Sequence, residues 1–230
     1  MDVLREASRR GANLVVTHEP TFYNHLDDSA FFADDPVYRE KLTFIQQHHM
    51  VVFRLHDQIH SVSPDPIASA LVAALGWQSY TEPSDPFRAT IPKTTLGKLS
   101  LELAKKLDAR SVRVVGNPDL SVTRVKLLPG ASGLHKQVLA LRSDDVEVLV
   151  VGEAAEWEAV EYVRDASAQG RHKAMIAVGH EVSEEPGMKQ CAEDLRALFP
   201  SLLVVHIPAG QPFWTPGDQP AFAANNRLAK

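Results

Sequence analysis

Residues 146–180 read VEVLVVGEAAEWEAVEYVRDASAQGRHKAMIAVGH, a stretch in which two short apolar runs flank a segment with helical spacing. The apolar runs are Val146–Val151 and Lys173–Val178, and their length and composition predict buried strands. Glu156–Gln169 lies between them and has the spacing of a helix that Gly170 ends. A strand, a helix and a second strand in this order are typical of a sheet with parallel strands.

The same alternation continues in both directions along the chain. Further predicted strands are Asn13–Thr17, Val51–Leu55, Ser111–Val115, Arg124–Leu128 and Leu202–Ile207. Further predicted helices are Met1–Arg10, Val37–His49, Asp65–Leu75, Thr95–Leu107 and Pro186–Leu198. Pro186 suits the first turn of the last of these helices. The alternation predicts an α/β fold with a mixed or parallel sheet.

Composition limits the classes of function. The 230 residues suffice for one large domain or two small ones, and a net charge of −5 gives no global attraction to nucleic acid or membranes. No apolar run approaches the ~20 residues that span a bilayer, so no membrane segment is expected. Cys191 is the only cysteine, so no disulfide can form within the chain, which fits a cytoplasmic protein.

Five potential metal ligands lie at or just beyond the ends of apolar runs. They are His18, Glu19, His60, His180 and Glu184. Ligands gather at the carboxyl ends of strands in open α/β sheets. Imidazole and carboxylate donors together suit Zn, Mn, Fe or Ni. The sequence therefore predicts a metal site.

The first two donor segments leave alternatives open. His18 and Glu19 are adjacent, and the turn before Pro20 lets both reach one ion or two; the alternative is a solvated loop pair. A spacing of four would place His56 and His60 on one helix face, although the preceding residues resemble a strand. His60 is the predicted ligand there, His56 is assigned to packing or indirect support, and Asp57 is a substitute ligand.

The third segment, residues 179–187, reads GHEVSEEPG. His180 and Glu184 share a face if one helical turn follows the strand, so they could grip one ion. Glu181 and Glu185 are nearby alternatives. A charged first turn that complements the helix dipole would explain the glutamates but not His180.

Four blocks of the sequence together resemble the NGG-interacting-factor-three-like family, the GTP cyclohydrolase I type 2-like dinuclear-metal proteins. Gly11–Pro20 resembles the family's Gly-Ala-Asp-Leu-x-x-x-His-His-Pro, and His56–His60 is similar to its His-Thr-Asn-Leu-Asp. Leu128–Gly133 resembles its Gly-Gly-Ser-Gly loop. Gly179–Gly187 resembles its Gly-His-x-x-x-Glu block.

The resemblance implies two divalent metal ions (Zn, Mn, Fe or Ni) held at the positions of His18, Glu19, His60, His180 and Glu184. It also implies a mixed-sheet α/β core of two related lobes with a metal cleft between them, and a homohexamer. Residues 1–230 would form one domain, with lobes of approximately 1–85 with 135–230, and 86–134. The chain resembles the family's short form. The family pattern begins about one strand and one helix earlier, so we expect a late start in this sequence.

Two positions depart from the family pattern in opposite senses. Glu19 stands where the family has its second histidine, and His60 stands where it has aspartate. The exchange keeps one imidazole and one carboxylate, so we expect a compensated site. Trp157 lies near a family histidine position, which leaves the substrate side of the pocket undefined.

The expected function is metal-assisted hydrolysis of a nucleotide or phosphoester, which is a small-molecule substrate. Glu184 would orient the attacking water, and Glu181 would carry protons, with Glu153 or His56 as substitutes. The alternative is a non-enzymatic metal-binding regulatory or scaffold protein. Nucleic acid is not an expected partner, because the chain is acidic and has no basic stripe.

Overall fold

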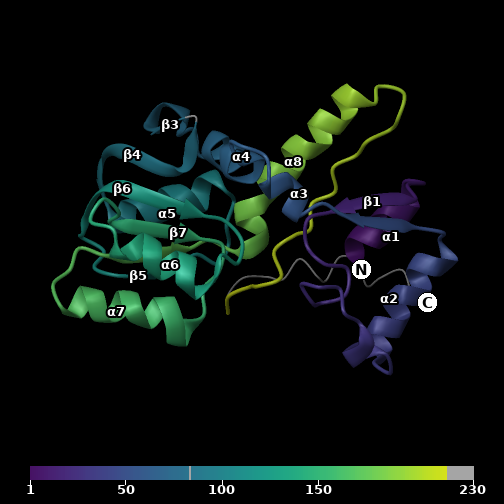
Figure 1. Ribbon diagram of the computed structural model, residues 1–230, viewed down its shortest axis with the longest axis horizontal. Coiled ribbons are helices and arrows are strands. Elements are labelled where there is room, and N and C mark those ends of the chain that lie inside the picture. The colour runs from purple at the N-terminus through teal and green to yellow at the C-terminus, as the bar shows by residue number, and fades with distance from the viewer. Residues whose placement is uncertain (83, 217–230) are drawn as a thin grey trace. The chain divides into compact units, whose positions relative to one another are not determined.

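A computed structural model describes residues 1–82 and 84–216 of the chain (Figure 1). The chain divides into two compact units. The first comprises Met1–Leu71 and Glu185–Ala209, and the second comprises Val72–Glu184 and Gly210–Lys230. Each unit is described by itself below.

The first unit contains a small parallel sheet with helices. Its elements are α1 (Asp2–Arg9), β1 (Leu14–Thr17), η1 (Ala30–Phe32), α2 (Pro36–Gln47), β2 (Val51–Arg54), α3 (Asp57–His60), and parts of α4 (Pro66–Leu75) and α8 (His180–Leu198). β1 pairs with β2 in register from Leu14 with Val51 to Thr17 with Arg54. Both strands therefore end at the same edge.

A compact apolar core fixes these strands. Leu4 and Ala7 of α1 pack with Val15 of β1 and with Met50, and Val52 of β2 packs against them. Side chains alternate along a strand, so Val15 points inward while Leu14 is exposed. Burial of one face of a strand therefore fixes the direction in which the residues after that strand leave the sheet.

The second unit is built on a larger mixed sheet. Among its described residues the strand order is β3-β4-β6-β7-β8-β5. The strands are β3 (Thr81–Glu82), β4 (Asp85–Thr95), β5 (Arg113–Val115), β6 (Ser121–Leu128), β7 (Val148–Val151) and β8 (Ala174–Ala177). The other elements are η2 (Gln78–Tyr80), α5 (Leu96–Lys106), α6 (Gly133–Arg142), η3 (Glu156–Val160) and α7 (Glu161–Ala168).

The centre of this sheet is parallel and buried. β6, β7 and β8 run parallel, whereas β4 and β5 join them antiparallel. All four residues of β7 and of β8 are buried, as expected of parallel strands covered on both faces. Leu141 of α6 and Val163 of α7 pack against Leu149 and Met175. Figure 1 shows α6 and α7 beside these strands.

The predicted α/β class with a mixed sheet is confirmed. Two element predictions were wrong. Leu202–Ile207 forms no strand among the described residues, and Leu203 there is 84% exposed, so the apolar run lacks a sheet to join. The helix expected from Pro186 begins instead at His180, and Pro186 lies inside it.

The lobe boundaries expected from the sequence stay a prediction. Residues 121–128 and 148–151 pair in parallel within one sheet. The existence of two related lobes stays a prediction. Among the described residues, no helix has both the length and the apolar character needed to cross a membrane.

Candidate metal centre

Three histidines of the first unit meet at the carboxyl ends of β1 and β2. His18 follows β1 directly, and His56 and His60 lie at the start and end of the single turn α3. The ring centroids of His18 and His56 are 4.6 Å apart, and each lies 5.0 Å from the centroid of His60. One donor atom from each of the three rings lies within 4.8 Å of the others.

All three rings have their Nδ1 atoms engaged by oxygen, that of His56 by Asp57. Nδ1 of His18 lies 3.0 Å from the carbonyl oxygen of Leu55, and Nδ1 of His60 lies 2.7 Å from Oδ2 of Asp65. A carbonyl and an ionised carboxylate only accept hydrogen bonds, so both Nδ1 atoms carry the proton. In a neutral ring the lone pair is then on Nε2.

Asp65 is held so that it stays an acceptor. Its other oxygen, Oδ1, accepts the amide of Ala68 at 2.9 Å and thereby caps α4. Burial raises the pKa of Asp65, but the hydrogen bonds from His60 and from Ala68 outweigh it and hold the pKa below the ordinary value. A carboxylate that orients a histidine in this way is the usual support of a metal-binding imidazole.

The Nε2 atoms of His18 and His60 lie 3.2 Å apart. Two facing lone pairs repel unless a proton or a metal cation lies between them. Zn–N bonds of about 2.0–2.1 Å in a tetrahedral site separate two nitrogens by about 3.3 Å. The residues therefore fit a divalent cation.

Acidic and basic groups surround the histidines. Oε1 of Glu19 lies 3.7 Å from Nε2 of His56, and Asp57 binds Nδ1 of His56 at 2.7 Å. Arg54 donates from Nε to the carbonyl oxygen of His18 at 3.3 Å, and its Nη2 lies 3.1 Å from Nδ1 of His25. Arg54 thus fastens the loop after β1 to the end of β2.

The second unit gathers its candidate donors at the ends of its parallel strands. Backbone hydrogen bonds join the loops after β6, β7 and β8. The amide of Glu153 donates to the carbonyl oxygen of Gly130 at 3.1 Å, and the amide of Gly179 donates to the carbonyl oxygen of Gly152 at 3.0 Å. Ser183 of α8 accepts the amide of Gly130 at 2.9 Å. These contacts fix the start of α8 against the sheet.

His180 and Glu184 occupy that first turn. Nε2 of His180 lies 3.2 Å from Oε2 of Glu184, and its Nδ1 lies 3.6 Å from Oε1 of Glu153. Glu184 is only 6% exposed. Gly130 (φ +65°) leaves no room for a side chain, because an added Cβ would overlap Oε1 of Glu184 and lie 3.4 Å from Nε2 of His180. The backbone at Gly130 therefore packs directly against the side chains of His180 and Glu184.

The structure brings the predicted residues together within each unit. His18 meets His60, and Glu19 lies 3.7 Å from His56. His180 meets Glu184 on one helical turn, which is the geometry that a spacing of four gives. Glu181 lies in the turn of His180, where its Oε1 is 3.6 Å from the position of a Cβ on Gly179. The assignment of all five donors to one dinuclear site stays a prediction.

His56 was predicted to pack or to give indirect support, and its ring stacks on that of His18. Its role stays a prediction. The sequence placed a strand over residues 51–55; in the structure this strand ends at Arg54 and one helical turn follows.

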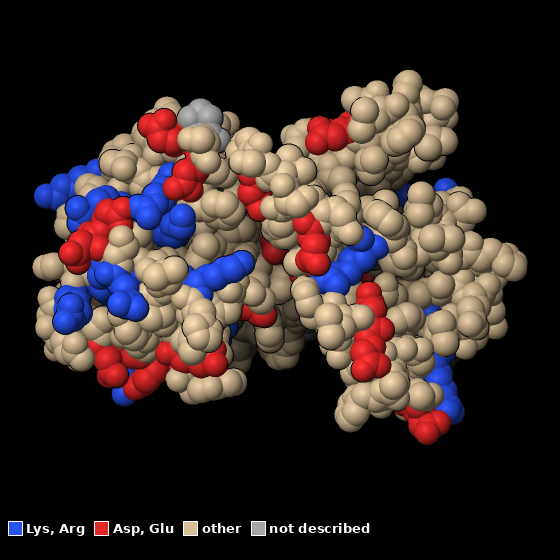
Figure 2. All heavy atoms as spheres, viewed as in Figure 1, with Lys and Arg blue, Asp and Glu red and all other residues tan. Residues whose placement is uncertain are grey.

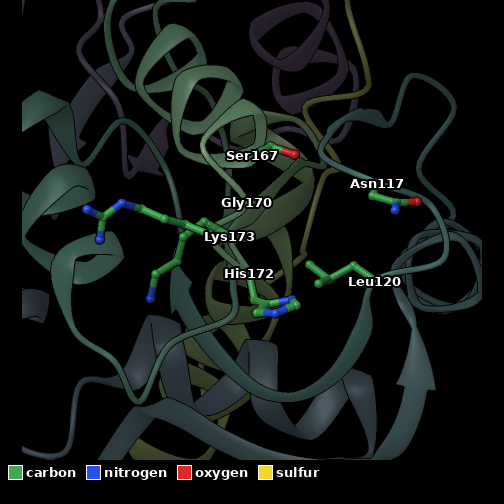
Figure 3. A pocket seen from close by; sticks show the side chains of 7 residues that line it. Asn117, Leu120, Ser167, Gly170, His172 and Lys173 are labelled. Carbon is green, nitrogen blue, oxygen red and sulfur yellow. The ribbon is translucent and has the colours of Figure 1, made fainter.

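A separate hollow in the second unit does not include the candidate donors. It is lined by Asn117, Leu120, Ser167, Gly170, Arg171, His172 and Lys173. Figure 3 shows His172 and Leu120 directed toward one another, and the ammonium of Lys173 is bound by the carbonyls of Ser143 and Val146 at 2.7 and 2.6 Å. Its lining contains His172 and the cations Arg171 and Lys173 but no carboxylate.

The surface charge of the second unit is mixed. On the face drawn in Figure 2, basic and acidic side chains stand beside one another over this unit. Arg124 pairs with Glu147 at 2.8 Å, and Arg88 pairs with Asp145. Such alternation differs from the one-signed field that attracts nucleic acid.

Comparison with known proteins identifies the family. Residues 1–211 match the Duf34/NIF3 (NGG1p interacting factor 3) family, so the chain belongs to it. A Mycobacterium tuberculosis protein named GTP cyclohydrolase 1 type 2 homolog is 28% identical over 169 residues, which are 66% of this chain and 43% of that protein. The Mycobacterium bovis protein of the same name matches equally. The match thus spans less than half the length of these relatives.

Solved structures share the fold. A Staphylococcus aureus hypothetical protein superposes with a TM-score of 0.69 at 16% identity, covering 94% of this chain and 84% of its own. A Bacillus cereus protein related to NIF3 gives a TM-score of 0.67 at 17% identity, covering 94% of this chain and 85% of its own. At these identities the likeness supports the fold alone.

Proposed function

We propose that this protein is a divalent-metal-dependent hydrolase whose metal ligands include His18 and His60. The observation that carries the proposal is the pair of Nε2 atoms 3.2 Å apart, both on rings whose Nδ1 atoms are engaged by oxygen. The family resemblance adds Glu19, His180 and Glu184 as further ligands and a second ion. Metal number and identity are part of the proposal.

The second unit carries acidic residues that suit hydrolysis. A divalent ion, if held by the proposed ligands, would supply Lewis acidity for the attack of water on a polar bond. Glu184 is buried and fixed against His180, so its carboxylate is suited to orient a water. Glu181 in the same turn is the proposed proton carrier. Ser183 and Gly130 keep this turn in place.

The proposed substrate is a nucleotide or another phosphoester. Support comes from the name of the mycobacterial relatives, GTP cyclohydrolase 1 type 2 homolog. That name describes proteins of which the match covers 43%, so the substrate comes to this chain only as a proposal. Assembly into a homohexamer is likewise a prediction from the family resemblance.

Metal titration followed by turnover assays tests the proposal. Metal-stripped protein is titrated with Zn²⁺, Mn²⁺, Fe²⁺ and Ni²⁺, and the loaded protein is then incubated with GTP, ATP and an aryl phosphoester. We expect metal binding and metal-dependent turnover that Glu184→Gln abolishes. Absence of metal binding would contradict the proposal. Metal binding without turnover of any substrate would instead favour a regulatory or scaffold role.

A further inference from the structure

The structure assigns His56 as a third imidazole ligand, which makes the first unit a three-histidine site with a preference for Zn²⁺ over Mn²⁺. This inference rests on the proposed metal-binding function and deepens it. His18, His56 and His60 form a nearly equal-sided cluster, with ring centroids 4.6, 5.0 and 5.0 Å apart. Donor atoms of all three lie within 4.8 Å of one another.

All three rings share one hydrogen-bonding pattern. Nδ1 of His56 lies 2.7 Å from Oδ1 of Asp57, just as Nδ1 of His18 faces the carbonyl of Leu55 and Nδ1 of His60 faces Asp65. An ionised carboxylate only accepts hydrogen bonds, so Nδ1 of His56 carries the proton in this pair. Each ring therefore offers Nε2 as its donor atom.

Local structure gives His56 a defined direction. It precedes α3, whose single turn brings the start and the end of the segment onto one side. Its side chain is 21% exposed, and that of His60 is 31% exposed. His18 is buried at 5%. The set thus has one enclosed ring and two partly exposed rings.

The donor type predicts the metal. Three neutral imidazoles suit Zn, Cu, Fe and Ni, whereas Mn and Mg favour carboxylate and carbonyl oxygen. Relative to the family pattern, the exchange at positions 19 and 60 therefore changes the donor atoms as well as the charge. It places an imidazole at position 60, beside the imidazoles of His18 and His56.

Zinc affinity of matched histidine variants tests the inference. His56→Asn keeps a side chain that can begin α3, His60→Asn removes a ligand of the proposed function, and His172→Asn removes an exposed histidine of the second unit. We expect His56→Asn and His60→Asn each to weaken binding of the first Zn²⁺ by at least about tenfold, and His172→Asn to leave it unchanged. Competition should favour Zn²⁺ over Mn²⁺ in the wild-type protein.

The outcomes separate this inference from the proposed function. If the wild-type protein binds no metal, both fail. If His60→Asn weakens binding and His56→Asn does not, the proposed function stands and the role of His56 is refuted. Zn X-ray absorption at one equivalent provides a measurement on the unmodified protein: three imidazoles are expected around zinc, and two or fewer would refute the inference.

Discussion

The hydroxyl of Ser183 accepts the amide of Gly130 at 2.9 Å and donates to the carbonyl of His180 at 2.7 Å. Ser183 is 1% exposed, so water cannot replace these bonds. One side chain thereby joins the loop after β6 to the first turn of α8, where the donors His180 and Glu184 stand. The position of these donors therefore depends on a buried hydroxyl.

Replacement of Ser183 by Ala should destabilise the protein. The amide of Gly130 would lose its acceptor, and a buried unsatisfied donor costs roughly 1–3 kcal/mol. Denaturant unfolding of Ser183→Ala measures the change, with Ser121→Ala, at an exposed position at the start of β6, as the control. If Ser183→Ala lowers the free energy of unfolding no more than the control does, the hydrogen bond does not stabilise the fold.

Gly130→Ala should perturb the donor pair, whereas Gly133→Ala should not. Both glycines have positive φ (+65° and +76°), so both variants share a backbone cost of about 1–2 kcal/mol. Only at position 130 does the new Cβ overlap Glu184; nothing described lies within 4 Å of it at position 133. We expect metal affinity to fall in Gly130→Ala alone. Equal affinities, measured by calorimetric titration, would contradict this.

Asp65→Asn should weaken metal binding and also lower stability, because its charge-assisted hydrogen bonds become neutral ones. Asparagine can still cap α4, but it is a poorer acceptor for Nδ1 of His60 than a carboxylate. Loss of such a supporting carboxylate typically lowers metal affinity about 10–100-fold. Asp35→Asn, at the cap of α2, is the matched control. Unchanged affinity in Asp65→Asn would remove Asp65 from the metal site.

Glu147 should contribute stability that disappears in acid. Partial burial raises its pKa, but hydrogen bonds from the amides of Thr123 and Arg124 (2.7 and 2.9 Å) outweigh it and keep the pKa below the ordinary 4.5. A carboxyl with a lowered pKa stabilises the fold above its unfolded pKa, and this stabilisation is lost as pH falls through the folded pKa.

Comparison of Glu147→Gln with the wild-type protein checks this pH dependence. The variant should lose about 1–3 kcal/mol at pH 7, because two charge-assisted hydrogen bonds become neutral ones. The difference in unfolding free energy should shrink below pH 4.5. A difference that stays constant from pH 7 to pH 3 would show that the carboxylate charge is not responsible.

The strand and helix alternation was readable from the sequence because buried parallel strands leave uninterrupted apolar runs. Val148–Val151 and Ala174–Ala177 are such runs, and the helix between them was predicted with them. Leu202–Ile207 has a similar composition but no strand, since composition reports burial preference and not whether a pairing partner exists. Whether a segment finds a strand to pair with depends on the whole fold.

The local geometry around the candidate donors could be predicted in part, whereas their roles as ligands stay a prediction. The spacing of His180 and Glu184 sufficed to predict their pairing, because a helical turn fixes i and i+4. The change from strand to helical turn after Arg54, which sets the position of His56, was not predicted, since it follows from tertiary structure. The roles of Ser183 and Gly130 depend on contacts between residues far apart in the sequence, and no local pattern predicts them.

Zinc affinity of His18→Ala and His60→Ala, measured by calorimetric titration of metal-stripped protein, tests the metal assignment most directly. If the Nε2 atoms 3.2 Å apart are metal donors, each variant should bind Zn²⁺ at least about tenfold more weakly than the wild-type protein while folding normally by circular dichroism. Folded variants that bind Zn²⁺ with wild-type affinity would contradict the assignment of these histidines as ligands.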